Sequence, residues 1–349
     1  MHSFKKKHIL FLTPGFPPDE ANTQCIPALQ IFAKAMSLEK EVKISIICLH
    51  YPQQYGQRKW NGLEVYDAYA NNKIRIFWNV WKWVKIIQLR QSIDIIHSFW
   101  LNDTAFLGHW IGRFKNIPHC ITLMGQDARP SNNYLRLLPL KRLNLIALSD
   151  FHADVYQQTT GYHIQNIIPW ALAGTDINPS IQKKTIDIIG VGNLIPLKAY
   201  DQFIRVIKAI SEQHQIPLRV AIVGTGTEEK QLKQQAKDLG LEKIIHFYGN
   251  VDRQQVLALM QQSKVFLHPS SYESFGLVFL EALANGAFVV SRKVGIAQAN
   301  THWLLAQTEE KMVEQCLSAL ENTAQIQAIN PYVIEETVAA YLRFWKGLY

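Results

Sequence analysis

The chain has 349 residues, which is too long for one ordinary hydrophobic core and predicts two domains. Its composition, 48% hydrophobic and 18% charged, is that of a soluble globular protein, and no apolar run reaches the length of a membrane span, which argues against an integral membrane protein. The four cysteines, at positions 25, 48, 120 and 316, show no paired spacing, so neither a disulfide framework nor a zinc site is expected, and a reducing cytoplasm fits best.

The net charge of +8 is distributed unevenly along the chain. Residues 1–175 contain 19 Lys and Arg against 11 Asp and Glu, whereas residues 176–349 contain 17 of each sign. The excess in the first half predicts an anionic partner there, such as a membrane surface, a lipid-linked acceptor or an acidic glycan. Nucleic acid is the competing anion, but the sequence contains no recognised nucleic-acid-binding module.

The first half alternates short apolar runs with amphipathic segments, which predicts a Rossmann-like domain over residues 1–172. The segment 51–72, rich in Tyr, Gln and Trp, is assigned no element, and the turn-like composition of residues 169–179 marks the domain boundary. Strands are predicted at 8–12, 42–49, 93–99 and 119–124, and helices at 25–37, 76–90 and 103–114.

The predicted helix 76–90 is amphipathic and basic. Its apolar side either covers the predicted sheet or lies on anionic lipid, and Trp78 and Trp83 keep the second interpretation open. On a helical wheel the apolar side carries Phe77, Val80, Trp81, Val84 and Ile87, and the basic side carries Lys82, Lys85 and Arg90.

The second half repeats the alternation and predicts a second Rossmann-like domain over residues 180–328, followed by a helical segment within residues 331–349. The fold class is therefore α/β, with two doubly wound parallel-sheet domains that face a cleft. Strands are predicted at 185–191, 218–223, 243–247, 265–268 and 288–291, and helices at 200–212, 228–239, 275–285 and 331–345.

The most informative segment is 269–282, with the sequence PSSYESFGLVFLEA. It predicts a polar turn after a buried strand, followed by an apolar helix, so that Glu273 lies in the turn and Glu281 in the helix. The free N–H groups of the first helical turn and the positive end of the helix dipole suit a diphosphate. Glu281 lies among apolar residues, where the hydroxyls of a ribose could satisfy its carboxylate.

The spacing of Glu273 and Glu281, with Phe275, Gly276 and Leu277 between them, closely resembles the signature of retaining glycosyltransferases of family four. The resemblance implies the GT-B fold, with acceptor binding in the first domain and donor binding in the second. It places Glu273 beside the donor sugar, the three intervening amides beside the sugar and diphosphate, and Glu281 on the ribose. It also implies that the segment 331–349 crosses back to the first domain.

A second group of donor-binding candidates follows two other predicted strands of the second domain. Gly192 allows a close backbone approach, and Lys198 can reach a phosphate, so Lys198 joins Glu273 as a catalytic candidate. Members of the family usually have an arginine where this chain has Asn193, so one expected cationic contact is missing. Gly224 and Gly226 can either lie near the nucleotide or form an ordinary tight turn.

Three residues of the first half are candidates for the acceptor side of the expected cleft. Gly15 follows the first strand, although an ordinary turn explains it equally well. His97 ends a strand and either points into the cleft or lies satisfied in the core. Asp127 follows a segment in which the family has a histidine near the sugar, but Met124 stands at that position and does not take over its role.

The chain contains no Asp-x-Asp triplet, so we expect no metal ion and no cofactor, with the helix dipole and Lys198 offsetting the leaving-group charge. The sequence thus predicts a metal-independent retaining enzyme, cytoplasmic or peripheral at the inner face of the membrane. It would move a sugar from a nucleotide-sugar to a glycan or lipid-linked acceptor in polysaccharide or glycolipid synthesis.

A non-catalytic nucleotide-sugar or glycan-binding protein is the alternative. A nicotinamide-dependent oxidoreductase is disfavoured because the first strand lacks the Gly-x-Gly-x-x-Gly turn.

Overall fold

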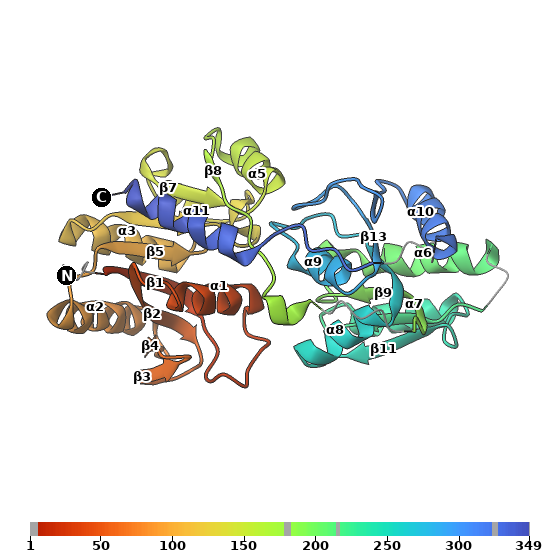
Figure 1. Ribbon diagram of the computed structural model, residues 1–349, viewed down its shortest axis with the longest axis horizontal. Helices are drawn as coiled ribbons and strands as arrows, with labels where there is room; N and C mark the ends of the chain where they lie inside the picture. Colours follow the sequence, from red (N-terminus) through yellow and green to blue (C-terminus); the bar gives the residue numbers. More distant parts are fainter. Residues whose placement is uncertain (1–5, 178–182, 214–216, 323–326, 349) are drawn as a thin grey trace. The chain divides into compact units, whose positions relative to one another are not determined.

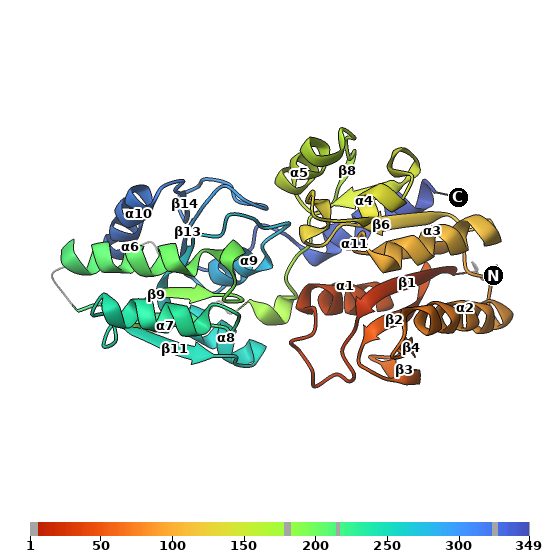
Figure 2. The same ribbon diagram turned by 180° about the vertical axis from the view of Figure 1, so that it is seen from behind.

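The computed structural model describes the whole chain except residues 1–5, 178–182, 214–216, 323–326 and 349 (Figures 1 and 2). It divides into two compact units, one formed by Met1–Trp170 with Tyr332–Tyr349 and the other by Ala171–Pro331. Each unit contains its own parallel β-sheet with helices packed on it, which confirms the predicted class of two α/β domains. Among the described residues no helix is both long and apolar enough to cross a membrane.

The sheet of the first unit has eight strands in the order β3-β4-β2-β1-β5-β6-β7-β8, and every pairing is parallel except that of β3 with β4. The central strands are continuous apolar runs because helices cover both faces of the sheet. The strands are β1 Lys7–Gly15, β2 Val42–Tyr51, β3 Tyr55–Trp60, β4 Leu63–Ala68, β5 Ile95–Phe99, β6 His119–Thr122, β7 Asn144–Ala147 and β8 Asn166–Ile167.

Alternate residues of β1 contact different helices. Leu10 and Leu12 pack in one core cluster with residues of α2 and α3. Phe11 points to the opposite face, where its ring contacts Phe32 of α1 and Trp345 of α11. The helices of this unit are α1 Pro27–Ser37, α2 Lys73–Arg90, α3 Asp103–Lys115, α4 Tyr134–Leu137, α5 Asp150–Thr160 and α11 Ile334–Lys346.

The hairpin formed by β3 and β4 was not predicted from the sequence. Its turn is Asn61-Gly62, and both residues have positive φ angles, 44° and 79°, as a type I′ turn requires. The Asn-Gly pair was therefore a readable hairpin signal inside the segment 51–72.

The sheet of the second unit has six strands in the order β11-β10-β9-β12-β13-β14, all parallel. Two helices, α8 and α10, were absent from the sequence prediction. The strands are β9 Ile186–Val191, β10 Val220–Val223, β11 Ile245–Gly249, β12 Ser263–His268, β13 Phe288–Ser291 and β14 Trp303–Leu305. The helices are α6 Tyr200–Gln213, α7 Glu229–Asp238, α8 Arg253–Gln261, α9 Leu277–Ala284 and α10 Glu309–Glu321.

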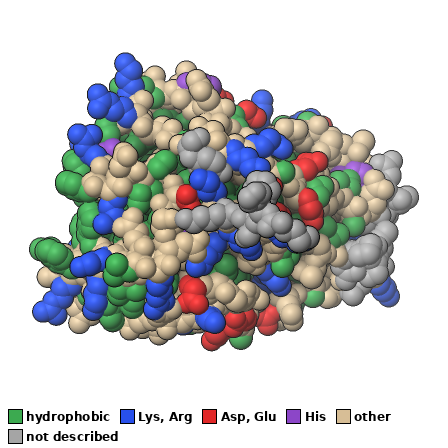
Figure 3. Space-filling view, turned by 60° about the vertical axis from the view of Figure 1, so that its left-hand side comes forward, with side chains coloured by type: hydrophobic (Ala, Val, Ile, Leu, Met, Phe, Trp, Pro, Cys, Tyr) green, Lys and Arg blue, Asp and Glu red, His purple; other side chains and the backbone are tan. Residues whose placement is uncertain are grey.

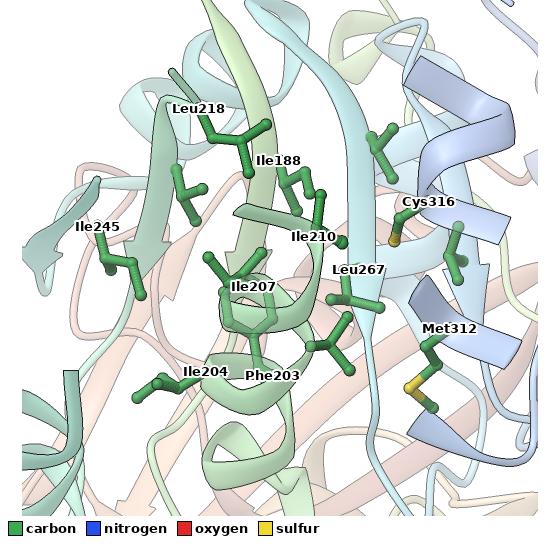
Figure 4. Packing of buried hydrophobic residues seen from close by; sticks show 14 of the residues in the cluster. Ile188, Phe203, Ile204, Ile207, Ile210, Leu218, Ile245, Leu267, Met312 and Cys316 are labelled. Carbon is green, nitrogen blue, oxygen red and sulfur yellow. The ribbon is translucent and has the colours of Figure 1, made fainter. Parts of the chain in front are cut away.

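The core of the second unit lies between this sheet and the helices α6 and α10 (Figure 4). Ile204, Ile207 and Ile210 recur on one face of α6 and are fully buried, and each such side chain contributes about 1.5–3 kcal/mol of burial free energy. Gly190 in β9 lets α6 approach closely, because a Cβ atom there would lie 2.8 Å from the ring of Phe203.

Candidate functional site

The register of the second sheet brings the carboxyl ends of four strands to one edge. Val223 pairs with Val191, and His268 pairs with Ser291, while Phe266 of β12 pairs with Ile189 of β9. The loops that follow β9, β10, β12 and β13 therefore leave the sheet together, which is where open α/β sheets bind ligands.

Glu273 lies in the turn after β12 and contacts the side chains of Lys198 and His268. The Lys198 ammonium, at the end of the 3₁₀ turn Pro196–Lys198, contacts its Oε1 atom. The Nε2–H group of His268 donates to the same oxygen at 2.6 Å. The two loops are joined by the Ser271 N–H group, which donates to the carbonyl of Leu197 at 3.1 Å. The structure thus brings both predicted catalytic candidates into direct contact.

Electrostatics keep Glu273 ionised. Burial by itself raises its pKa, but Lys198 and the His268 hydrogen bond outweigh burial and hold the pKa at about 2. Burial lowers the pKa of His268, an effect that Glu273 offsets only in part, so the imidazole is neutral near pH 7. The site therefore contains a carboxylate, an ammonium and a neutral imidazole in one contact network.

We expect this network to contribute a pH-dependent part of the stability. The pKa of Glu273 is lower in the folded protein than its ordinary value of 4.5, so ionised Glu273 stabilises the fold above that pH. This stabilisation is lost as the pH falls toward 2, so the wild type should lose more unfolding free energy than Glu273→Gln between about pH 5 and about pH 3. Urea unfolding at both pH values measures the difference. Equal losses in the two proteins would contradict the network.

The start of α9 is shaped by glycines. Gly276 immediately precedes the helix with φ 90°, and a Cβ atom there would lie 2.4 Å from the ring of Phe279. Gly295 lies behind the turn, where a Cβ atom would lie 2.2 Å from the carbonyl oxygen of Phe275. No side-chain hydrogen bond caps the helix, so the amides at its start, at Gly276 and Leu277, and the positive helix end suit an anion.

Glu281 belongs to a different cluster. The residue is 7% exposed, and its carboxylate contacts the guanidinium of Arg253, the first residue of α8. The Nη2 atom of Arg253 also lies 3.0 Å from Oδ2 of Asp176. Burial raises the pKa of Glu281, and Arg253 offsets that rise only in part. The sequence predicts that a ribose satisfies this carboxylate, whereas in the structure its cationic partner is Arg253 of the chain itself.

The arginine should be important for stability. Arg253→Ala leaves Glu281 buried beside no cation, and breaking such a pair costs about 3–5 kcal/mol of unfolding free energy. The double variant Arg253→Ala/Glu281→Gln should recover part of the loss, because the uncompensated charge is gone. Arg219→Ala is the control, since Arg219 also pairs with an aspartate but its side chain is 57% exposed. Urea unfolding that shows equal losses for the two arginine variants would contradict this account.

The glycines that follow β9 and β10 pack two loops together, backbone to backbone. A Cβ atom on Gly224 would lie 2.0 Å from the carbonyl oxygen of Gly192, and one on Gly226 would lie 2.2 Å from that of Leu194. Gly224 also has φ 135°. This packing explains both glycines without a ligand. Asn193, between the two contacts, is exposed.

The three candidates of the first unit lie at a strand end, in a loop and in the core. Gly15 ends β1 at the carboxyl edge of the first sheet. Asp127 accepts N–H hydrogen bonds from Leu101, Met124 and Gly125 at 2.8–3.1 Å, so its carboxylate holds the loop after β6 in place. His97 is completely buried, and its Nε2 atom lies 2.8 Å from the hydroxyl of Thr122. Aromatic rings surround it, with Phe99 stacked at 4.4 Å, so the structure places His97 in the core and not at an accessible surface.

Sequence reasoning missed three residues of these clusters. His268 had a signal, because it is the polar last residue of the predicted strand 265–268, whose other residues are apolar. Arg253 had only an indirect one, since Asp252 and Gln255 form an N-terminal capping pattern that marks the start of α8. Asp176 lies in the segment that was interpreted only as a domain boundary.

The fold is similar to that of solved glycosyltransferase-type structures. The structure resembles HepE of Anabaena, solved with UDP and glucose, with a TM-score of 0.69 and 19% identity over 97% of this chain and 95% of that one. It also resembles the sucrose-phosphate synthase of Thermosynechococcus elongatus, with a TM-score of 0.71 and 16% identity over 98% of this chain and 95% of that one. The fold is therefore that of the GT-B glycosyltransferases, with two parallel-sheet α/β domains.

Sequence comparison identifies a known family in the second unit. Residues 176–331, which lie in the second unit, match the family described as Glycosyl transferases group 1, so this unit is a glycosyltransferase group 1 domain. The gpi3 subunit of phosphatidylinositol N-acetylglucosaminyltransferase from Schizosaccharomyces pombe is 28% identical over 273 residues, covering 72% of this chain and 59% of that protein. The D-inositol 3-phosphate glycosyltransferase of Corynebacterium urealyticum is 29% identical over 242 residues, covering 60% of this chain and 57% of that protein. The aligned parts thus span less than two thirds of either relative.

Proposed function

We propose that the protein is a retaining glycosyltransferase that moves a sugar from a nucleotide-sugar donor, bound by the second unit, to an acceptor bound by the first. The observation that carries the proposal is the ionised Glu273, held between Lys198 and His268 next to the uncapped start of α9. The Glu273 carboxylate suits the sugar end of the bond to be broken, where positive charge develops. Lys198 and the helix start suit the diphosphate end, where negative charge develops.

In the proposed reaction the bond between the anomeric carbon and the diphosphate oxygen breaks, and the diphosphate leaves with the electron pair. The amides at the start of α9 and the Lys198 ammonium stabilise its charge, and the Glu273 carboxylate stabilises the positive charge on the sugar. The acceptor hydroxyl forms the new bond on the face that the diphosphate leaves, and its proton passes to a diphosphate oxygen. Catalysis is then mainly positioning and electrostatics.

The acceptor is proposed to be a glycan or a lipid-linked molecule at the cytoplasmic face of a membrane, in cell-surface polysaccharide or glycolipid synthesis. The first half of the chain carries the whole excess of positive charge, which favours an anionic acceptor. The names of the two relatives above both refer to inositol compounds, so inositol phosphate and phosphatidylinositol belong in the first acceptor panel.

A thermal-shift screen over nucleotide-sugars tests donor binding, because a ligand that binds only the folded state raises the melting temperature. UDP-sugars come first, since HepE was solved with UDP-glucose. Sugar transfer to the acceptor panel then tests turnover. Absence of any stabilising nucleotide-sugar would overturn the proposal.

A non-catalytic nucleotide-sugar or glycan-binding protein is the second candidate. It is favoured by Asn193 and Met124, which replace the usual arginine and histidine of the family. A nucleotide-sugar that raises the melting temperature, without product from any acceptor, would favour this candidate.

We further propose that turnover needs no metal ion, because the chain has no Asp-x-Asp triplet to place a cation on the diphosphate. Turnover is expected to continue in excess EDTA at an unchanged rate. A loss of activity that added Mg²⁺ or Mn²⁺ restores would refute this.

A further inference from the structure

The outer side of α2 carries exposed apolar residues in addition to those that pack on the sheet. Val80, Val84 and Ile87 already cover the sheet from the inner side. On the outer side the exposed fractions are 66% for Ile74, 73% for Trp78 and 78% for Leu89. Side chains of this size on a solvent-facing stripe point to an interaction surface.

The neighbouring helix α3 extends this apolar surface. Phe114 is 71% exposed and Trp110 is 38% exposed. The ring of Phe114 lies 6.0 Å from that of Trp81 in α2 and 6.0 Å from that of Trp110. The outer sides of the two helices are thus joined by ring contacts, and we call them together the α2–α3 surface.

The α2–α3 surface carries charge of one sign. Residues 73–90 contain no Asp or Glu, and the only acidic residue of α3, Asp103, is buried. Within the described part of the chain none of the basic residues of this surface forms an ion pair. Figure 3 shows hydrophobic side chains interspersed with Lys and Arg on the left of the view. The basic residues are Lys73, Arg75, Lys82, Lys85, Arg90, Arg113 and Lys115.

A basic pocket opens beside the end of α3. Its volume is about 490 Å³, and its lining includes His109, Arg113 and Arg142 but no acidic residue. It lies at the start of β6 and β7, because Pro118 and Asn144 also line it. The pocket is therefore suited to a phosphate group.

We propose that the α2–α3 surface docks on an anionic phospholipid bilayer. Trp78, Trp110 and Phe114 enter the headgroup region, the basic side chains contact lipid phosphates, and the pocket takes one phosphate near Arg142. A second copy of the chain does not fit as the occupant, because a self-contact would oppose seven cations to seven cations. The proposal does not depend on glycosyl transfer, and vesicle binding tests it separately.

The experiment is co-sedimentation with vesicles of phosphatidylcholine alone or with about 30% phosphatidylglycerol, at about 0.1 M and about 1 M salt. The wild type should sediment with anionic vesicles at low salt and remain in solution at high salt or with phosphatidylcholine alone. Trp78→Ser/Phe114→Ser and Lys82→Glu/Lys85→Glu should each weaken the apparent affinity about tenfold or more, and Arg142→Ala should weaken it less.

Matched controls separate docking from general effects. Leu38→Ser/Leu137→Ser removes exposed apolar side chains elsewhere in the first unit, and Lys230→Glu/Lys237→Glu reverses exposed lysines of α7. Both should bind like the wild type, and unchanged melting temperatures show that each variant is folded. Wild-type protein that ignores anionic vesicles, binding that survives both pairs of surface variants, or a dimer that the Trp78/Phe114 variant dissociates would overturn the proposal.

Discussion

Glu273→Gln should lower kcat by about a hundredfold or more, while the affinity for the donor changes by no more than about threefold. The reason lies in the charge of Glu273, since its pKa of about 2 keeps the carboxylate ionised at any working pH. Glutamine retains the size and a hydrogen-bond acceptor, so the turn should keep its shape while the charge that we propose to lie beside the sugar is lost. Steady-state kinetics together with calorimetric titration of the donor measure the two effects.

Glu242→Gln is the matched control for this variant, because Glu242 is an exposed residue of the same unit. It should leave both quantities unchanged. If Glu273→Gln weakened donor binding as much as it lowered kcat, Glu273 would be a donor ligand and not a residue that acts in the transition state.

Lys198→Ala should weaken donor binding by about 1.5–3 kcal/mol, which is about a 10- to 150-fold rise in Kd. The loss follows because the proposal assigns the charge-assisted contact with the diphosphate to the Lys198 ammonium, which lies against the Glu273 carboxylate in the turn before α9. Calorimetric titration with the nucleotide diphosphate alone isolates the phosphate contact from the sugar contact. Lys237→Ala, which removes an exposed lysine of α7, is the control. Unchanged nucleotide affinity in Lys198→Ala would remove Lys198 from the donor site.

Periodicity and composition were sufficient to predict the central strands of both sheets and several of the helices, but not α10 or the edge strand β14. The strand 288–291 coincides with β13, and the predicted helix 76–90 ends with α2 at Arg90. These segments carry dense apolar runs or clear amphipathic stripes, so local sequence and tertiary packing favour the same structure. The nine residues of α8 carry one short apolar block, 256–260, between polar ends, so the local sequence shows no repeating stripe that would mark a helix.

The orientation of α2 shows a limit of wheel analysis. The sequence argument placed Phe77 and Trp81 on the inward side, but both are only half-buried, whereas Trp83 is 8% exposed. The indole N–H of Trp83 donates to the carbonyl of Asp67 in the unpredicted hairpin at 3.1 Å, so this side of the helix also packs on that hairpin. Of the two interpretations, α2 does cover the sheet, and the membrane interpretation keeps Trp78 but loses Trp83, which is buried.

Contacts between separate elements were the least predictable part of the site. The motif identified Glu273 and Glu281, but their partners come from β12, from the loop after β9 and from α8. Such pairs depend on the register of neighbouring strands and on the position of helices, which no single segment encodes. The sequence could therefore suggest acidic groups near a ligand, but not that Glu273 is ionised and Glu281 is paired with Arg253.

The most direct test of the central claim is the anomeric configuration of the product, followed by NMR during sugar transfer from the nucleotide-sugar that raises the melting temperature most. The account predicts that the wild type yields a product with the configuration of the donor, and that Glu273→Gln yields almost none over the same time. A product of inverted configuration, or an undiminished rate in Glu273→Gln, would contradict it.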